Sequence, residues 1–209
     1  MGIDRSQIVL AYERHSDRVY VAEAKDAGLG VVRGYDDTPF DAIITKEKGL
    51  ALCVKTADCV PIVLLDPVKG AVGVVHSGWV GSSKHIAGKT VKKMAEAFGS
   101  APKDILCFMG PYNHACCYEV GEDVRLRFQE AFSEEECRTL FRKKDEAGKY
   151  WLDLGSAVSF SLCREGVSPV HIHDSGLCTF HTSTFSSWRR TRNEKKQMIT
   201  YILLRKMNV

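Results

Sequence analysis

Three short runs rich in valine, isoleucine and leucine follow one another closely, and no other feature of the sequence constrains the fold as strongly. Runs of this length and composition are typical of strands, and the residues between them have the composition of turns. A turn with two glycines, Gly78 and Gly81, follows the third run, and the next apolar residues recur at helical spacing until Gly99. The sequence therefore predicts three adjacent strands, a glycine turn and a helix, with the strands at 50–55, 60–66 and 71–76 and the helix at 86–98.

The rest of the chain alternates predicted strands and helices in an irregular order. The same patterns predict strands at 105–109, 170–172 and 199–204 and helices at 121–132 and 154–164. This irregular order predicts an α+β fold in which mixed β-sheets are flanked by helices, and not a regular parallel βαβ series. The sequence has no repeat, low-complexity tract or linker rich in proline and serine, so we expect a single domain over residues 1–209.

The composition excludes several classes of protein. With 44% hydrophobic and 26% charged residues, the chain is neither disordered nor fibrous. The longest unbroken apolar run, 59–65, is far shorter than the roughly 20 residues needed to cross a bilayer. A net charge of +3 is too small to indicate nucleic acid as the main partner. We therefore expect no membrane and no nucleic-acid partner, and the sequence leaves the oligomeric state open.

Eight cysteines raise the question of disulfide bonds or metal. A chain of this length can build a core without disulfides, and no export signal begins the sequence, so we expect reduced thiols in the cytoplasm. Cys116 and Cys117 are adjacent, and adjacent strand residues point to opposite faces, so we predict that both pack in the core. His171 and His173 would share one face of a strand, but no third ligand lies nearby, so we predict a structural or surface role.

Cys59 and His76 form a more informative pair. Cys59 lies at the start of one predicted strand and His76 at the end of the next. In an antiparallel hairpin these two positions lie at the same edge of the sheet, so the thiol and the imidazole are expected to meet there. Two chemistries use such a pair, a cysteine–histidine nucleophilic dyad and a metal held by thiolate and imidazole. Spacing alone leaves both open.

A basic cluster lies near the C-terminal end of the sequence, beside Trp188. Such a cluster is typical either of a solvated face or of a site for an anion. We carry both interpretations for its members, Arg189, Arg190, Arg192, Lys195 and Lys196.

Residues 56–61 read T-A-D-C-V-P and residues 75–79 read V-H-S-G-W. These two blocks resemble the TADC-x-P and V-H-A-G-W motifs of the laccase-domain family, and further blocks match in that family's order, at 41–45, 110–111, 117–121, 152–154, 177–179 and 185–190. The family was once described as multicopper polyphenol oxidases and is now better known for zinc-dependent purine nucleoside phosphorylase activity; it includes peptidoglycan editing factors.

The resemblance implies a zinc site. The family's ligands fall on His15, Cys59 and His76, and the same comparison makes Cys59, His76 and Asp58 the catalytic candidates and Arg189 and Arg190 the candidates for binding substrate anions. One thiolate and two neutral imidazoles leave a vacant fourth position on zinc, as in catalytic sites. The activity implied is phosphorolysis of a purine nucleoside with phosphate, with adenosine deamination as a second reaction of the same zinc.

The sequence also departs from the family. It begins just before the first ligand and so lacks the usual N-terminal segment, and the family's arginine after the V-H-A-G-W tryptophan is Val80. Because a guanidinium can bind phosphate with two hydrogen bonds, Val80 removes a candidate anion contact. One alternative is therefore an inactive zinc-binding module.

Two other chemistries remain open. One is a cysteine hydrolase or peptidoglycan-precursor editing enzyme using Cys59 and His76, since the family's fold resembles the catalytic domain of cytotoxic necrotizing factor. The other is copper, because two histidines and a cysteine are also the ligands of blue copper. An oxidase needs further histidine clusters, and His171 and His173 are the one His-x-His repeat in the sequence, so we expect zinc in preference to copper.

Overall fold

The computed structural model describes residues 3–36, 38–145, 147–193 and 195–205. Its largest element is a six-stranded mixed sheet in the order β11-β7-β5-β6-β3-β2. The antiparallel pairs β7–β5, β5–β6 and β6–β3 form its centre, and the parallel pairs β11–β7 and β2–β3 form its edges. The strands are β2 Val19–Val21, β3 Ala42–Thr45, β5 Val60–Asp66, β6 Ala71–Ser77, β7 Leu106–Met109 and β11 Ile172–Asp174.

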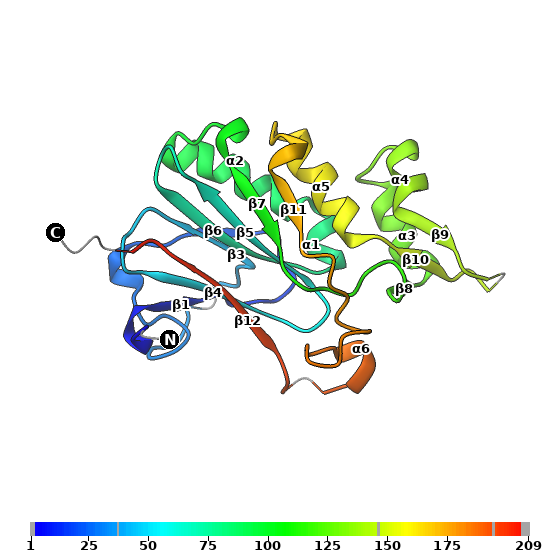
Figure 1. Cartoon of the computed structure of the whole chain (residues 1–209), viewed down its shortest axis with the longest axis horizontal. Coiled ribbons are helices and arrows are strands. Elements are labelled where there is room, and N and C mark those ends of the chain that lie inside the picture. Colours follow the sequence, from blue (N-terminus) through cyan, green and yellow to red (C-terminus); the bar gives the residue numbers. More distant parts are fainter. Residues whose placement is uncertain (1–2, 37, 146, 194, 206–209) are drawn as a thin grey trace.

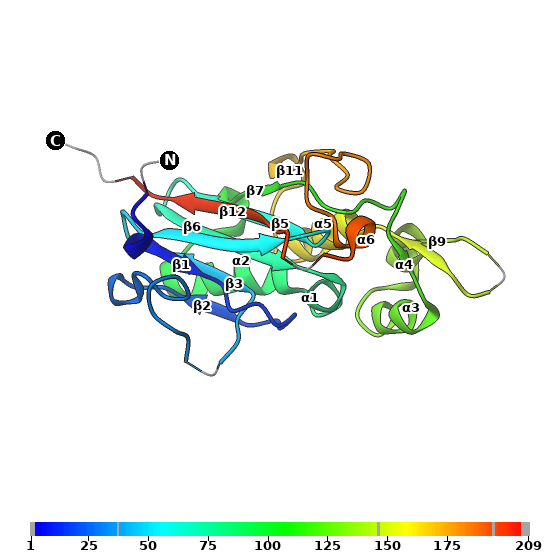
Figure 2. The ribbon, with the colours of Figure 1, turned by 90° about the horizontal axis from the view of Figure 1, so that it is seen from below.

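A second sheet of three strands covers one face of the large sheet (Figure 2). It consists of β1 (Ile8–Leu10), β4 (Ala51–Thr56) and β12 (Met198–Leu203), with β4 in the centre, parallel to β1 and antiparallel to β12. Leu52 and Val54 from β4 pack with Val72 and Val74 from β6 in a core between the two sheets. The period of two along each strand thus directs alternate side chains into this layer.

The other face of the large sheet is covered by helices (Figure 1). Val60, Ile62 and Leu64 of β5 point to this side and pack with Val91 and other apolar residues of the helices. Since both faces of the sheet are buried, β5 and β6 read as nearly continuous apolar runs. The covering helices are α1 (Trp79–Ser83), α2 (Ile86–Phe98) and α5 (Leu154–Arg164).

A smaller unit lies at the end of the molecule opposite β1 (Figure 1). It holds a three-stranded sheet in the order β8-β10-β9 and two helices. These elements are β8 Glu119–Val120, α3 Glu122–Gln129, α4 Glu134–Leu140, β9 Phe141–Lys143 and β10 Tyr150–Leu152, and the short helix α6, Trp188–Thr191, precedes β12. Phe128 and Leu140 join this unit to the helix-side core. No helix in the described parts of the chain is long and apolar enough to span a membrane.

The expected α+β class of mixed sheets and flanking helices is confirmed, and so are most of the predicted elements. The helix at 86–98 is α2, and Gly99 ends it with a φ of 69°. The strand at 60–66 is β5.

Four predictions about local structure are wrong. The strand expected at 170–172 lies further along the chain, because Pro169–His171 is a 3₁₀ helix and β11 begins at Ile172. The strand at 50–55 is not adjacent to the next strand, because β4 pairs with β1 and β12 in the other sheet. His171 does not share a strand face with His173, because it ends a 3₁₀ helix, Pro169–His171, and only His173 lies in β11. Cys116 and Cys117 are not core residues, because they lie in a turn, the first exposed and the second half-buried.

Candidate metal centre

The structure brings His15, Cys59 and His76 together at the end of the large sheet where β5 begins and β6 ends. One ligand atom from each residue lies within 4.8 Å of the others. In the β5–β6 ladder Val60 is opposite Ser77 and Pro61 is opposite His76, so Cys59 arrives beside the end of β6 as the hairpin argument predicts. His15 comes from the loop after β1, and its ring lies 5.1 Å from that of His76 at 72°. We call these three residues the metal triad.

A fully buried aspartate, Asp41, holds two parts of the metal triad in place. Its Oδ1 accepts a hydrogen bond from the backbone N–H of His15 at 3.0 Å and is 2.8 Å from Nδ1 of His76. Its Oδ2 accepts from the backbone N–H and the hydroxyl of Ser16. Burial alone would raise the pKa of Asp41, but the hydrogen bonds from His76 and Ser16 lower it below its ordinary value. A carboxylate on Nδ1 leaves Nε2 of His76 free for a metal.

The thiol of Cys59 is poised to ionise. Burial opposes the charged form, but the two neighbouring histidines outweigh it and lower the pKa of Cys59 to about 6. In return, Cys59 raises the pKa of His15 by a hydrogen bond, and it helps Asp41 to raise the pKa of His76 against the effect of burial. Thiolate is the form of cysteine that binds metal or acts as a nucleophile.

Gly78 packs directly against the metal triad. A Cβ atom at this position would lie 2.9 Å from Cδ2 of His15, closer than real Cβ contacts, and 3.0 Å from Sγ of Cys59, which is tighter than most of them. The backbone therefore approaches the two ligands to a distance that only glycine allows. One thiolate, two imidazoles, an aspartate on one of them and this close backbone fit a zinc ion bound by His15, Cys59 and His76.

Asp58, beside Cys59, has a backbone φ of 95°, which is strained for a residue other than glycine. Its Oδ1 accepts from the hydroxyl of Thr179 at 2.6 Å and its Oδ2 from the backbone N–H of Arg189 at 2.6 Å. Its carbonyl accepts from the backbone N–H of Asn113. Asp58 thus joins three separate chain segments next to the metal triad, and both of its carboxylate oxygens are engaged.

Two of the three arginines of the basic cluster, Arg189 and Arg190, bind backbone carbonyls. Arg189 donates from Nη1 to the carbonyl of Glu119 at 2.8 Å and lies over the ring of Tyr118. Arg190 donates from Nη1 to the carbonyls of Thr179 and Phe180, and from Nη2 to that of Phe185. Both are half-buried, whereas Arg192, Lys195 and Lys196 are exposed. The solvated-face interpretation therefore fits the last three residues.

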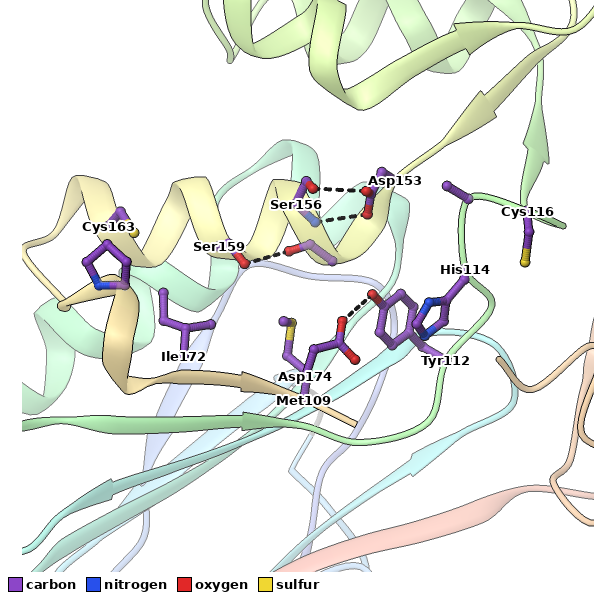
Figure 3. Close-up of a pocket in the computed structure, with 13 residues that line it drawn as sticks. Met109, Tyr112, His114, Cys116, Asp153, Ser156, Ser159, Cys163, Ile172 and Asp174 are labelled. Atoms are coloured by element: carbon purple, nitrogen blue, oxygen red, sulfur yellow. Dashed lines mark hydrogen bonds between the residues drawn. The ribbon is translucent and has the colours of Figure 1, made fainter. Parts of the chain in front are cut away.

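A cavity of about 540 Å³ lies beside α5 and the loop after β7 (Figure 3). On the wall of this cavity, the hydroxyl of Tyr112 donates to Oδ2 of Asp174 at 2.7 Å, and the ring of His114 stacks on that of Tyr112. No residue of the metal triad lines it. The wall is nevertheless tied to the triad, because Asn113, between Tyr112 and His114, donates to the carbonyl of Asp58.

Sequence reasoning expected Cys59 and His76 to meet and added His15 through the family resemblance, but it gave Asp41 no role. Asp41 begins one of the matching blocks, yet its hydrogen-bond partners lie 25 to 35 residues away in the chain. Nothing in the local pattern around Asp41 shows those contacts. The block match was the one signal available.

The sequence of this chain is similar to that of known proteins over nearly its whole length. Residues 1–205 match the family model described as "Multi-copper polyphenol oxidoreductase laccase". The chain belongs to this family. A relative named purine nucleoside phosphorylase YlmD, from Bacillus subtilis, is 34% identical over 95% of this chain and 71% of its own length.

Other family members carry related names. A purine nucleoside phosphorylase of Bacteroides thetaiotaomicron is 32% identical over 79% of the chain, and the match spans only 61% of that relative's length. A protein named adenosine deaminase RL5, from an unknown prokaryotic organism, is 33% identical over 90% of the chain and 72% of its own. The crystal structure of the Bacillus licheniformis hypothetical protein YfiH superposes with a TM-score of 0.90 at 31% identity, covering 98% of this chain and 76% of that one.

Proposed function

We propose that this protein is a zinc-dependent purine nucleoside phosphorylase that cleaves adenosine or inosine with phosphate. The observation that carries the proposal is the convergence of His15, Cys59 and His76, with Asp41 on the second histidine. The names of two family members, purine nucleoside phosphorylases, support the reaction class. Zinc held by these three residues would supply a Lewis acid and a bound water that ionises near pH 7.

The residues of this chain have distinct tasks in the proposal. Asp41 holds the proton on Nδ1 of His76 and so fixes the orientation of the imidazole. Asp58 acts as a positioning residue, because its carboxylate fastens the segments of Thr179 and Arg189 beside Cys59. Catalytic contact with substrate is assigned to the metal triad and not to Asp58.

The cavity whose wall is joined to the metal triad through Asn113 and Asp58 is a candidate nucleoside site. Its volume of about 540 Å³ is within the range of small-molecule pockets. The carboxylates of Asp153 and Asp174 line it, and carboxylate oxygens can accept hydrogen bonds from ribose hydroxyls. For phosphate, we assign the contact to Arg189, because Arg190 uses both of its terminal nitrogens on carbonyls.

Eight free thiols are suited to a reducing compartment, and we propose a cytoplasmic location.

Product analysis tests the function. Purified protein is incubated with adenosine or inosine, with and without phosphate, and the free base and ribose 1-phosphate are measured. We expect phosphorolysis that needs phosphate and is lost in Cys59→Ala. Release of inosine and ammonia from adenosine without phosphate would show the deaminase reaction suggested by the name of RL5. No turnover of either nucleoside, in protein that contains zinc, would contradict the proposal and indicate an inactive zinc-binding module.

One observation favours a second candidate, a cysteine hydrolase. The contacts have the spatial order of a catalytic triad: the carboxylate of Asp41 contacts the imidazole of His76, which lies beside the thiol of Cys59. Such an enzyme could hydrolyse a peptidoglycan precursor. Activity that survives removal of zinc but is lost when Cys59 is alkylated would establish this chemistry, and competition between a muramyl precursor and a purine nucleoside would identify the substrate.

A further inference from the structure

A second group of metal-ligand side chains lies outside the metal triad. Cys116, Cys117, Cys178 and His181 each offer a ligand atom, and these atoms all lie within 4.8 Å of one another. We call this group the cysteine cluster. It combines two segments more than 60 residues apart, the turn after β7 and the loop after β11.

Backbone hydrogen bonds align these two segments. Tyr112 and Cys178 form a parallel bridge, in which the N–H of Tyr112 donates to Leu177 and the N–H of Thr179 donates to Tyr112. On the turn side, the backbone N–H of Cys117 donates to the carbonyl of His114. The turn lets two adjacent cysteines serve one site, because the side chains do not alternate across a strand. Backbone hydrogen bonds therefore place the two segments of the cysteine cluster side by side.

The separation of two sulfurs in the cluster matches that of a tetrahedral zinc site, since Sγ of Cys116 is 3.8 Å from Sγ of Cys178. Both nitrogens of His181 lie near the thiols: Nδ1 is 3.8 Å from Sγ of Cys116, and Nε2 is 3.2 Å from Sγ of Cys117. Tetrahedral Zn–S bonds of about 2.3 Å place two sulfurs about 3.8 Å apart. The distances are too long for a disulfide, whose sulfurs are about 2.05 Å apart. All eight cysteines are free thiols.

Cys178 is the buried member of the cysteine cluster, and its sulfur lies 3.8 Å from that of Cys116. Three cysteines and one histidine are a closed donor set typical of structural zinc.

We propose that Cys116, Cys117, Cys178 and His181 bind a second zinc ion, which is structural. The site ties the turn at 115–117 to the loop at 178–181. Thr179 of that loop donates to Asp58, and Arg190 donates to the carbonyls of Thr179 and Phe180. The second zinc thus supports the segment that packs beside Cys59, without contributing a ligand to the metal triad.

Metal content tests this site independently of the proposed reaction. The full chain is purified under reducing conditions without chelator, and zinc per chain is measured for the wild type, for Cys116→Ser/His181→Asn and for Cys59→Ala. The double variant changes two exposed residues, so its fold is expected to survive, and circular dichroism checks this. Cys163→Ser, an exposed cysteine outside both groups, is the matched control.

We expect two zinc ions in the wild type and in Cys163→Ser, and one in each of the other two variants. Cobalt substituted for zinc should show thiolate-to-metal absorption that falls sharply in the double variant and much less in Cys59→Ala, because the cysteine cluster holds three of the four sulfurs. Unchanged zinc in the folded double variant would overturn the second site. A disulfide between Cys116 and Cys178, found by mass spectrometry in the reduced preparation, would also overturn it. Loss of zinc in the double variant alone would leave this site standing and contradict the triad.

Discussion

Gly78→Ala adds a single methyl group to the metal triad and tests whether the approach of the backbone is required there. The new Cβ would lie 2.9 Å from Cδ2 of His15 and 3.0 Å from Sγ of Cys59. Gly78 has a φ of −79°, which any residue adopts, so the substitution introduces no backbone strain. The main effect is therefore the contact with the two ligands.

The expected magnitude follows from the distances. Ordinary contact begins at 3.4 Å, so the histidine carbon must move by about 0.5 Å and the sulfur by about 0.4 Å. Metal–ligand distances tolerate only about 0.2 Å. A displacement twice that size should weaken zinc binding by about 10- to 100-fold, the loss typical of disturbing the residues that hold a ligand in place. Alanine is also a poorer N-cap for α1 than glycine, which costs about 1 kcal/mol of stability.

Titration with a competing chelator measures the zinc affinity, and thermal unfolding measures the stability. We expect a lower affinity together with a melting temperature reduced by about 2–4 °C. Gly34→Ala is the matched control, because a Cβ there meets no atom within 4 Å. If Gly78→Ala keeps the zinc affinity of the wild type while the protein remains folded, the triad does not bind metal in the arrangement described.

Three further predictions follow from particular contacts. Asp41→Asn should reduce zinc affinity by about 10- to 100-fold by removing the carboxylate from His76, measured by the same titration, with the buried Asp66→Asn as control. Ile62→Ala, at a fully buried position of β5, should lower the free energy of unfolding by about 2–5 kcal/mol in a denaturant titration, whereas Val68→Ala, 67% exposed, should leave it nearly unchanged. Glu136 is partly buried, which raises its pKa, but hydrogen bonds from Ser133 and the charge of Arg164 outweigh this and lower the pKa below its ordinary value of 4.5. A carboxyl with a lowered pKa stabilises the fold above its unfolded pKa, and this contribution is lost as the pH falls through the folded value. Glu136→Ala should therefore cost about 1 kcal/mol at pH 7 and progressively less below pH 4.5; an equal cost at all pH values would refute this.

The sequence predicts the elements that depend on local pattern. The hairpin of β5 and β6 and the helix α2 follow from apolar runs, turn residues and Gly99, all within one stretch of chain. The meeting of Cys59 and His76 follows from the register of that hairpin. His15 was assigned through the family resemblance, since its loop has no local signal of its own.

Other features depend on contacts between distant segments. β4 pairs with β12, nearly 150 residues later, and no pattern in β4 indicates this partner. The chain leaves the three-stranded sheet and enters the large one at Asp58, whose φ of 95° turns the backbone there. The same distance in sequence hides the role of Asp41 and the cysteine cluster, whose members come from 116–117 and 178–181. In each case the information lies in tertiary contacts, and a doublet of cysteines in a turn cannot be told from one in a strand by spacing.

The family's description as a copper oxidase can be weighed against the ligands themselves. Two histidines and a cysteine match blue copper by type, but oxygen reduction by a multicopper centre needs further clusters of histidines. Within the described ranges, one other group of at least three ligand residues occurs, and it holds three cysteines and a single histidine. His171 and His173 do not supply another, since they do not share a strand face. Three cysteines and one histidine are a donor set that favours zinc, and without further histidine clusters in the described ranges the metal triad fits the proposed Lewis-acid role better than the transfer of electrons to oxygen.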